Sequence, residues 1–182
     1  MNGQMMQLPL LISSLIVHAE RHHGDQEVVS RRVEGDIHRT TYRELAARSR
    51  RMANALAGLG VKQSDRVATL AWNGYRHMEL YYAVSGSGAV LHTINPRLHP
   101  DQVVYIADHA EDQVLFFDLT FLPLIAAIAG RTKTIRHFVA MTDRAHLPAD
   151  AAKIPNLLVY EDLVDANHDR FDWPTFDENL AS

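Results

Sequence analysis

The stretch Gly88-Ala89-Val90-Leu91-His92-Thr93-Ile94-Asn95-Pro96-Arg97-Leu98 has the pattern of a buried strand that ends in a rigid turn. Residues 89–93 contain no acid and no lysine, and the stretch is rich in β-branched side chains, which favour an extended backbone. Pro96 has no backbone N–H and therefore ends the hydrogen bonding of the strand. We expect a strand over residues 89–94, followed by an Asn-Pro turn that presents Arg97.

Strand and helix patterns alternate on both sides of this stretch. Apolar strand patterns occur at residues 66–72, 113–117, 135–140 and 157–160, and helical patterns at residues 76–85, 100–110, 122–129 and 161–166. The segment 141–156, rich in Ala, Pro and Asp, is expected to be an exposed loop. Apolar strands that alternate with helices predict an α/β fold with a mostly parallel sheet flanked by helices on both faces.

The segment before residue 66 has a different pattern. Helical spacing over residues 8–22 predicts a leading helix within residues 1–24, and two short strands around Glu34-Gly35-Asp36 predict a β-hairpin over residues 27–41. We expect the alternating α/β part to cover residues 42–166 and a tail to cover residues 167–182.

A capping box predicts where the first long helix of the alternating part begins. The hydroxyl of Thr41 precedes the carboxylate of Glu44 by three positions, and the helix is expected to end at Gly58 or Gly60. Its basic residues fall mostly opposite the apolar side chains, so we interpret them as a solvated face: Arg43, Arg48, Arg50 and Arg51.

Composition limits the class of protein. The chain has 182 residues, of which 47% are hydrophobic and 22% charged, which fits one ordinary soluble domain with a real core. The absence of cysteine excludes disulfides and thiolate sites and is compatible with a cytoplasmic location. A net charge of −4 argues against a nucleic-acid partner. Neither a secretory signal nor a transmembrane segment is expected, because the apolar runs are short and interrupted.

Ligands of open parallel sheets bind beyond the carboxyl ends of the strands. The polar residues that follow the predicted strands are therefore the candidates for a ligand-binding face: Asn73, Asn95, Arg97, Asp118, Thr142 and Asp143. Asn and Asp are also common turn formers, so a structural role is the alternative. Arg97 is the most informative candidate, because a turn does not need a guanidinium group and this one can bind a phosphate or carboxylate, or a partner domain.

Other motifs do not point to catalysis. Gly86-Ser87-Gly88 follows a helix and leads into a strand, whereas a phosphate-binding loop follows a strand and opens a helix. His18 and His22 lack an acid at a position that would complete a zinc site, so no metal site is assigned. No Gly-x-Ser-x-Gly motif is present. The residues themselves therefore identify no catalytic group.

Several blocks nevertheless resemble the N-terminal part of the fatty acid–CoA ligases, a branch of the adenylate-forming enzymes. The blocks are residues 27–31, 38–45, 60–70, 88–98 and 105–112, and their order and spacing match the family across residues 8–165. The segment 60–70 contains the Asp-Arg-Val-Ala pattern common to the whole group, and residues 92–98 resemble the medium- and long-chain branch more narrowly. Ser64 and His99 depart from the family, which usually has glycine and a Ser or Thr cap there.

The resemblance implies a two-step reaction in which ATP and a fatty acid form an acyl-adenylate with the help of Mg²⁺, and coenzyme A then displaces AMP. The family's phosphate loop ending in Pro-Lys-Gly, its ribose-binding acid and its catalytic lysine are not found in residues 1–182. We therefore assign no catalytic, cofactor-binding or metal-binding residue from the family, and we expect this chain to be inactive alone. The resemblance and the uncovered edges of a partial sheet also predict a homo-oligomer.

Two other functions fit the residues. The chain can be a stand-alone α/β module that binds a small anion at Asn73, Asn95 and Arg97. It can also be an assembly module, with the leading helix and the hairpin as its interface.

Overall fold

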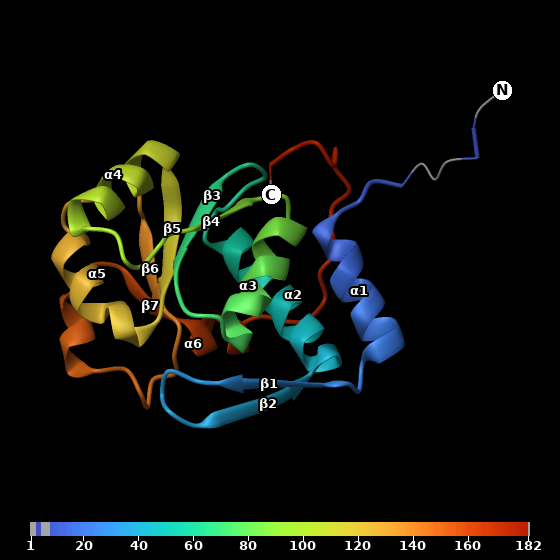
Figure 1. The fold of residues 1–182 in the computed structure, drawn as a ribbon, viewed down its shortest axis with the longest axis horizontal. Coiled ribbons are helices and arrows are strands. Elements are labelled where there is room, and N and C mark those ends of the chain that lie inside the picture. The colour runs from blue at the N-terminus through green and yellow to red at the C-terminus, as the bar shows by residue number, and fades with distance from the viewer. Residues whose placement is uncertain (1–2, 5–7, 182) are drawn as a thin grey trace.

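The computed structural model describes residues 3–4 and 8–181 (Figure 1). Its centre is a five-stranded sheet in the order β4-β3-β5-β6-β7, and every neighbouring pair is parallel. The strands are β3 (Arg66–Leu70), β4 (Val90–Thr93), β5 (Asp112–Phe117), β6 (His137–Ala140) and β7 (Leu157–Val159). The predicted α/β fold with a parallel sheet is confirmed.

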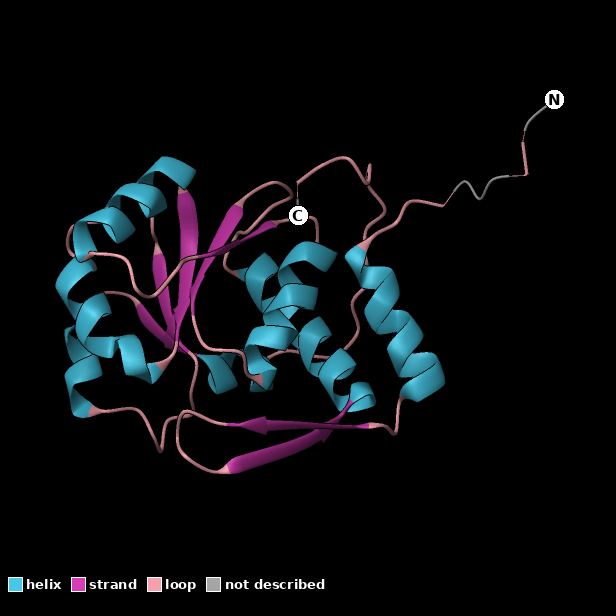
Figure 2. Ribbon diagram, in the orientation of Figure 1, coloured by secondary structure: helices cyan, strands magenta, loops and turns pink. Residues whose placement is uncertain are grey.

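Helices cover both faces of the sheet, as Figure 2 shows. On one face lie α4 (Pro100–Ala110) and α5 (Leu122–Ile128), and on the other lie α2 (Tyr42–Gly58), α3 (Tyr75–Gly86) and α6 (Tyr160–Asp165). Successive side chains of a strand point to opposite faces. Along β5, Leu115 and Phe117 belong to the first core, whereas Val114 and Phe116 belong to the second. Burial on both faces explains why the strands are apolar without alternation.

The N-terminal elements pack beside the second layer of helices. Helix α1 (Ile12–His23) contacts α2 and α3, and the strands β1 (Glu27–Arg31) and β2 (Ile37–Thr41) form the predicted antiparallel hairpin. The leading helix begins at Ile12 rather than at the predicted Leu8, and residues 1–2 and 5–7 of the predicted segment 1–24 lie outside the described residues.

Side chains cap the first turns of α2 and α4, and one turn contains a strained residue. Thr41 and Glu44 form the predicted capping box at the start of α2. His99 replaces the usual hydroxyl cap of α4: its side chain accepts from the amide of Asp101, and Gln102 accepts from the amide of His99. Ser64 has a φ of 66°, a left-handed conformation that favours glycine.

The tail after α6 has no helix or strand among its described residues and packs across α3. The indole of Trp173 lies against Gly86, where an added Cβ would be 2.7 Å from a ring carbon, and Phe176 lies against Gly88. The two glycines therefore make room for the tail. The segment 141–156 contains one element that we did not predict, the 3₁₀ helix η2 (Ala149–Lys153), and η1 (Leu119–Phe121) precedes α5.

None of the helices among the described residues combines the length and the apolar character that crossing a bilayer requires.

Candidate functional site: the carboxyl edge of the sheet and an adjacent groove

The carboxyl ends of β3 and β5 lie side by side, and the connections that follow them lead to opposite faces of the sheet. This is the position where ligands usually bind in a parallel sheet. Here the carboxylate of Asp118 accepts a hydrogen bond of 2.6 Å from the backbone amide of Trp72 and joins the two strand ends. Asp118 is 7% exposed, and its burial raises its pKa to about 6.

The hairpin covers this edge of the sheet, along the bottom of the view in Figure 1. Glu34, in the hairpin turn, accepts hydrogen bonds from the Arg76 guanidinium at 2.8 Å and from the Thr142 hydroxyl at 2.9 Å. Arg76 also donates to the carbonyl of Met141. Burial works against the ionised form of Glu34, but its backbone hydrogen bond and Arg76 outweigh burial and lower its pKa. The edge that topology offers to a ligand is thus filled by side chains of the chain itself.

A chain of buried ion pairs extends from Arg76 into the helices. Glu161 lies 2.7 Å from Arg76 and 2.9 Å from Arg48, and Arg48 lies 2.6 Å from Glu79. The Tyr160 hydroxyl donates to Glu79 at 2.7 Å. Burial raises the pKa of Glu79 despite Arg48, whereas Arg48 and Arg76 overcome the burial of Glu161 and lower its pKa. These contacts hold α2, α3 and α6 together beneath the hairpin.

The interpretation of the α2 arginines as a solvated face is wrong for Arg48 and Arg50. Arg48 belongs to the ion pairs just described, and Arg50 binds the carboxylate of Glu20 at 2.7 and 2.8 Å. Only 22% of the Arg48 side chain and 18% of the Arg50 side chain are exposed. Their partners come from distant parts of the sequence, so the periodicity of α2 contains no sign of them.

Turn chemistry accounts for two of the predicted ligand-face residues, Asn95 and Asp143. The Asn95 side chain accepts from the backbone amide of Arg97 at 3.0 Å, and Asp143 accepts from the amide of His146. Arg97 is exposed beside this turn. Asn73 is also exposed, and it lines two cavities that include neither Asn95 nor Arg97. The structure therefore does not bring Asn73, Asn95 and Arg97 into one pocket.

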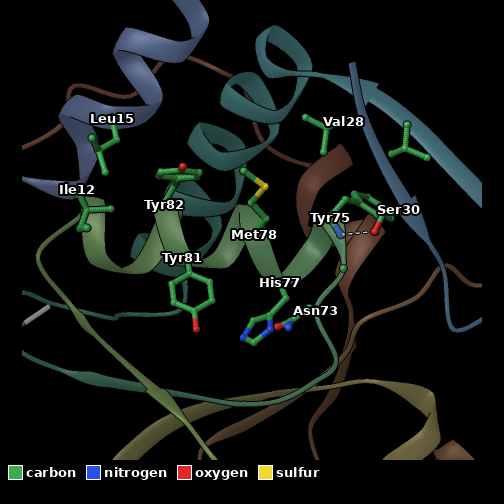
Figure 3. A pocket seen from close by; sticks show the side chains of 12 residues that line it. Ile12, Leu15, Val28, Ser30, Asn73, Tyr75, His77, Met78, Tyr81 and Tyr82 are labelled. Atoms are coloured by element: carbon green, nitrogen blue, oxygen red, sulfur yellow. Dashed lines mark hydrogen bonds between the residues drawn. The ribbon is translucent and has the colours of Figure 1, made fainter. Parts of the chain in front are cut away.

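The larger of these cavities is an apolar groove of about 460 Å³ that the sequence analysis missed (Figure 3). It lies between α1, β1 and α3, and its lining residues are Ile12, Leu15, Val28, Val29, Ser30, Asn73, Gly74, Tyr75, His77, Met78, Tyr81 and Tyr82. Met78, Tyr81 and Tyr82 recur at helical spacing, which places a second apolar face on α3. That repetition is the signal by which the sequence could have revealed the groove.

The described side chains form no cluster that could hold a metal ion, since no group of three or more His, Asp or Glu residues within residues 3–4 and 8–181 is arranged to do so. The pair of His92 and Asp112, 2.8 Å apart, lies across β3 toward the amino ends of β3 and β5, and Asp112 is fully buried. Hydrogen bonding to Asp112 raises the pKa of His92, and burial raises that of Asp112, as expected for a structural pair.

Comparison with known proteins gives the family. The profile described as "AMP-binding enzyme" matches residues 16–174. A 3-methylmercaptopropionyl-CoA ligase of Ruegeria lacuscaerulensis is 55% identical over the whole chain, and a medium-chain-fatty-acid–CoA ligase of Ectopseudomonas oleovorans is 49% identical over the whole chain. The chain spans 33% of the length of each of these two relatives.

The fold matches solved structures as well. The crystal structure of an anthranilate CoA ligase in complex with anthranoyl-AMP superimposes with a TM-score of 0.80 over 99% of this chain and 32% of that protein. The sequence identity is 20%, so this likeness concerns the fold alone. Since the family profile covers most of the chain and the alternating sheet has the same architecture, this chain belongs to the AMP-binding enzyme family.

Proposed function

We propose that this chain forms the N-terminal third of an acyl-CoA ligase. The complete enzyme activates a medium- or long-chain fatty acid with ATP to an acyl-adenylate and pyrophosphate, and coenzyme A then displaces AMP to give the thioester. The observation that carries this proposal is the identity of 49% to a medium-chain-fatty-acid–CoA ligase along the whole chain. A long-chain-fatty-acid–CoA ligase of Thermus thermophilus, 51% identical over 78% of the chain, supports the same substrate class.

A shorter acid is the second candidate substrate. The relative named for 3-methylmercaptopropionyl-CoA is 55% identical, so a small thioether acid fits the sequence as well as a fatty acid does. The two candidates differ in acyl length, and a series of acids from three to sixteen carbons separates them.

In this proposal the chain is a scaffold that does not bind nucleotide by itself. No group of three or more His, Asp or Glu side chains among the described residues is arranged to hold a metal ion, and Glu34 of the hairpin pairs with Arg76 and Thr142 at the carboxyl edge of the sheet. We therefore assign ATP, Mg²⁺ and coenzyme A to the complete enzyme and derive no step through them here. This chain contributes structure to the complete enzyme: it supplies the parallel sheet, the hairpin over the carboxyl edge and the apolar groove.

A chimera tests the proposal. The chain replaces the first third of the Ectopseudomonas oleovorans ligase, and formation of AMP and thioester is measured for each acid of the series. We expect turnover by the chimera and none by the 182-residue chain alone. Calorimetry of the chain with ATP or with a fatty acid is expected to show no heat of binding. A folded chimera without turnover contradicts the proposal, and so does thioester formation by the isolated chain.

We also propose that the isolated chain self-associates and that the protein resides in the cytoplasm. Strands β4 and β7 end the sheet and leave unpaired edges, which favours association. Light scattering at tens of micromolar is expected to show an oligomer, and a clean monomer contradicts this. The lack of cysteine is compatible with a reducing compartment, and cell fractionation checks the location.

A further inference from the structure

The smaller of the two cavities that Asn73 lines lies beneath the hairpin, at the carboxyl edge of the sheet. Its volume is about 30 Å³, and it is bounded by the end of β1 and the hairpin turn, the connection from β3 to α3, and the ends of β5 and β6. We call it the edge cavity. Its lining includes Arg76, His77 and Asp118, whose exposed fractions are only 5%, 5% and 7%. The part of the edge cavity that these three residues line is therefore shielded from bulk solvent.

Two polar atoms of these buried side chains have no hydrogen-bond partner among the described residues: Nη2 of Arg76 and Nδ1 of His77. The other two nitrogen atoms of the Arg76 guanidinium donate to Glu161 and to Glu34. The second ring nitrogen of His77 lies 3.1 Å from the Thr69 hydroxyl. Buried polar atoms are nearly always hydrogen-bonded, because an unsatisfied one has lost its bonds to solvent without replacement. Each of the two atoms therefore needs a partner that the surrounding side chains do not supply.

Asp118 supplies hydrogen-bond acceptors to the same cavity. One oxygen of its carboxylate accepts from the Trp72 amide, and a carboxylate can accept further bonds. Arg76 does not pair with Asp118, because its ion pairs are with Glu34 and Glu161. The two groups are nevertheless close enough to interact: burial raises the pKa of Asp118, and the charge of Arg76 works in the opposite direction. A donor and an acceptor that line one cavity without bonding to each other are typical of a site where water forms a bridge.

Size and charge limit what the edge cavity can bind. Roughly 10–15 Å³ of such space holds one water molecule, so a cavity of about 30 Å³ holds one water or two and no larger molecule. A small anion would lie against the carboxylate of Asp118, and a metal cation would lie against the guanidinium of Arg76. A neutral molecule that both donates and accepts hydrogen bonds fits this mixed lining.

We infer that an ordered water molecule occupies the edge cavity and joins Arg76 to Asp118 and His77. The water accepts from Nη2 of Arg76 and donates to the Asp118 carboxylate. Its third bond is to Nδ1 of His77, which accepts or donates according to the tautomer of the ring. The three bonds are the usual number for a buried water. They connect the first turn of α3 to the end of β5 beneath the hairpin, and this role does not depend on the proposed function.

A high-resolution crystal structure of the 182-residue chain tests the inference directly. We expect one density peak of the height of a water molecule, within hydrogen-bonding distance of both Nη2 of Arg76 and the Asp118 carboxylate. Crystals grown with sodium bromide or with rubidium chloride distinguish water from an ion, because bromide and rubidium scatter anomalously. An anomalous peak in the edge cavity means that the occupant is an ion and overturns the inference.

The same crystals can contradict the water bridge in two other ways. The Oε2 atom of Glu34 has no partner, while its Oε1 atom already accepts from Arg76. A direct bond from Nη2 of Arg76 to this Oε2 atom would satisfy both atoms without water and overturns the inference. An edge cavity without a density peak overturns it as well.

Two variants of Asp118 test the water in solution, with the contact between water and the Trp72 amide as the NMR signal. A bound water gives NOE and ROE signals of opposite sign, whereas proton exchange gives signals of equal sign. We expect this contact in wild type and in Asp118→Asn, which keeps a polar group of the same size. Asp118→Leu fills the cavity with apolar atoms and is expected to abolish the contact. A contact that persists unchanged in Asp118→Leu overturns the inference, as does its absence from wild type. If Asp118→Leu does not fold, the wild-type crystals decide.

Discussion

The carboxylate of Glu34 and the guanidinium of Arg76 form an ion pair of 2.8 Å, in which the two side chains are 1% and 6% exposed. One partner lies in the turn of the hairpin and the other in the first turn of α3, so the contact joins two elements that no local pattern connects. It fastens the hairpin over the carboxyl ends of the strands.

Removal of Glu34 tests how strongly this pair holds the fold. Glu34→Ala leaves Arg76 buried with one partner fewer, and we expect a loss of about 3 kcal/mol in the free energy of unfolding. Urea denaturation measures it. Glu27→Ala is the control, because its pair with Arg39 is exposed and worth at most about 1 kcal/mol. Equal losses for the two variants contradict the assigned role of Glu34.

Asp118 predicts a pH dependence of stability. Its pKa is about 6 in the folded chain against 3.8 as the ordinary value, because burial disfavours the charged form. The folded state thus binds a proton more tightly, and this contribution to stability is complete below pH 3.8 and is lost as the pH rises through 6.

The variant Asp118→Asn isolates this contribution, since the amide oxygen still accepts from Trp72 and cannot titrate. Relative to the variant, wild type is expected to lose up to about 3 kcal/mol between pH 4 and pH 7.5, at about 1.4 kcal/mol per pKa unit. Urea denaturation of both proteins across this pH range gives the difference. A difference that does not change with pH refutes the raised pKa of Asp118.

The packing of the tail on α3 requires the absence of a side chain at Gly86. A Cβ at residue 86 would lie 2.7 Å from a ring carbon of Trp173, so Gly86→Ala is expected to displace the indole and cost about 1–3 kcal/mol. Trp173 fluorescence and thermal unfolding report the change. Gly58→Ala, with no heavy atom within 4 Å of the added carbon, is the control and should not destabilise.

A double variant makes the steric test specific. If the clash is the cause, Gly86→Ala combined with Trp173→Ala costs less than the sum of the two single substitutions. Strict additivity would mean that Gly86 acts through the backbone and not through Trp173.

Replacement of Ser64 by glycine is expected to increase the stability of the chain. Its φ of 66° is strained for a residue with a Cβ, and its side chain is exposed. Ser64→Gly is expected to stabilise the chain by about 0.5–1 kcal/mol, because relief of strain exceeds the added entropy of the unfolded chain. Ser64→Ala keeps the strain and should give no gain. Differential scanning calorimetry compares the variants, and a gain from alanine would contradict the backbone explanation.

The local features of the chain could be predicted because their causes are close together in sequence. The capping box of Thr41 and Glu44 spans one helical turn, and the apolar strands follow from a β-branched composition that suits burial on both faces. The turn role of Asn95 also follows from its residue type and is the alternative to ligand binding.

The candidate site could not be predicted in the same way. The sequence places Asp118 at the carboxyl edge, but its bond to Trp72 depends on which strands are neighbours. The local pattern places Glu34 in a hairpin turn, and its partner Arg76 lies 42 positions later. Helix periodicity predicts a surface position for Arg48, because its partners Glu79 and Glu161 lie on other helices.

The amino-acid sequence by itself determined the alternation of strands and helices, the family and the positions of the turns, since these depend on side-chain pattern and on backbone preference within a few residues. Only the tertiary structure decided that the hairpin closes the carboxyl edge and that an apolar groove beside β1 stays open. The physical reason is that charge pairing and uncovered apolar area are properties of surfaces brought together by folding. Their free energies depend on distance and burial, which the order of residues along the chain does not contain.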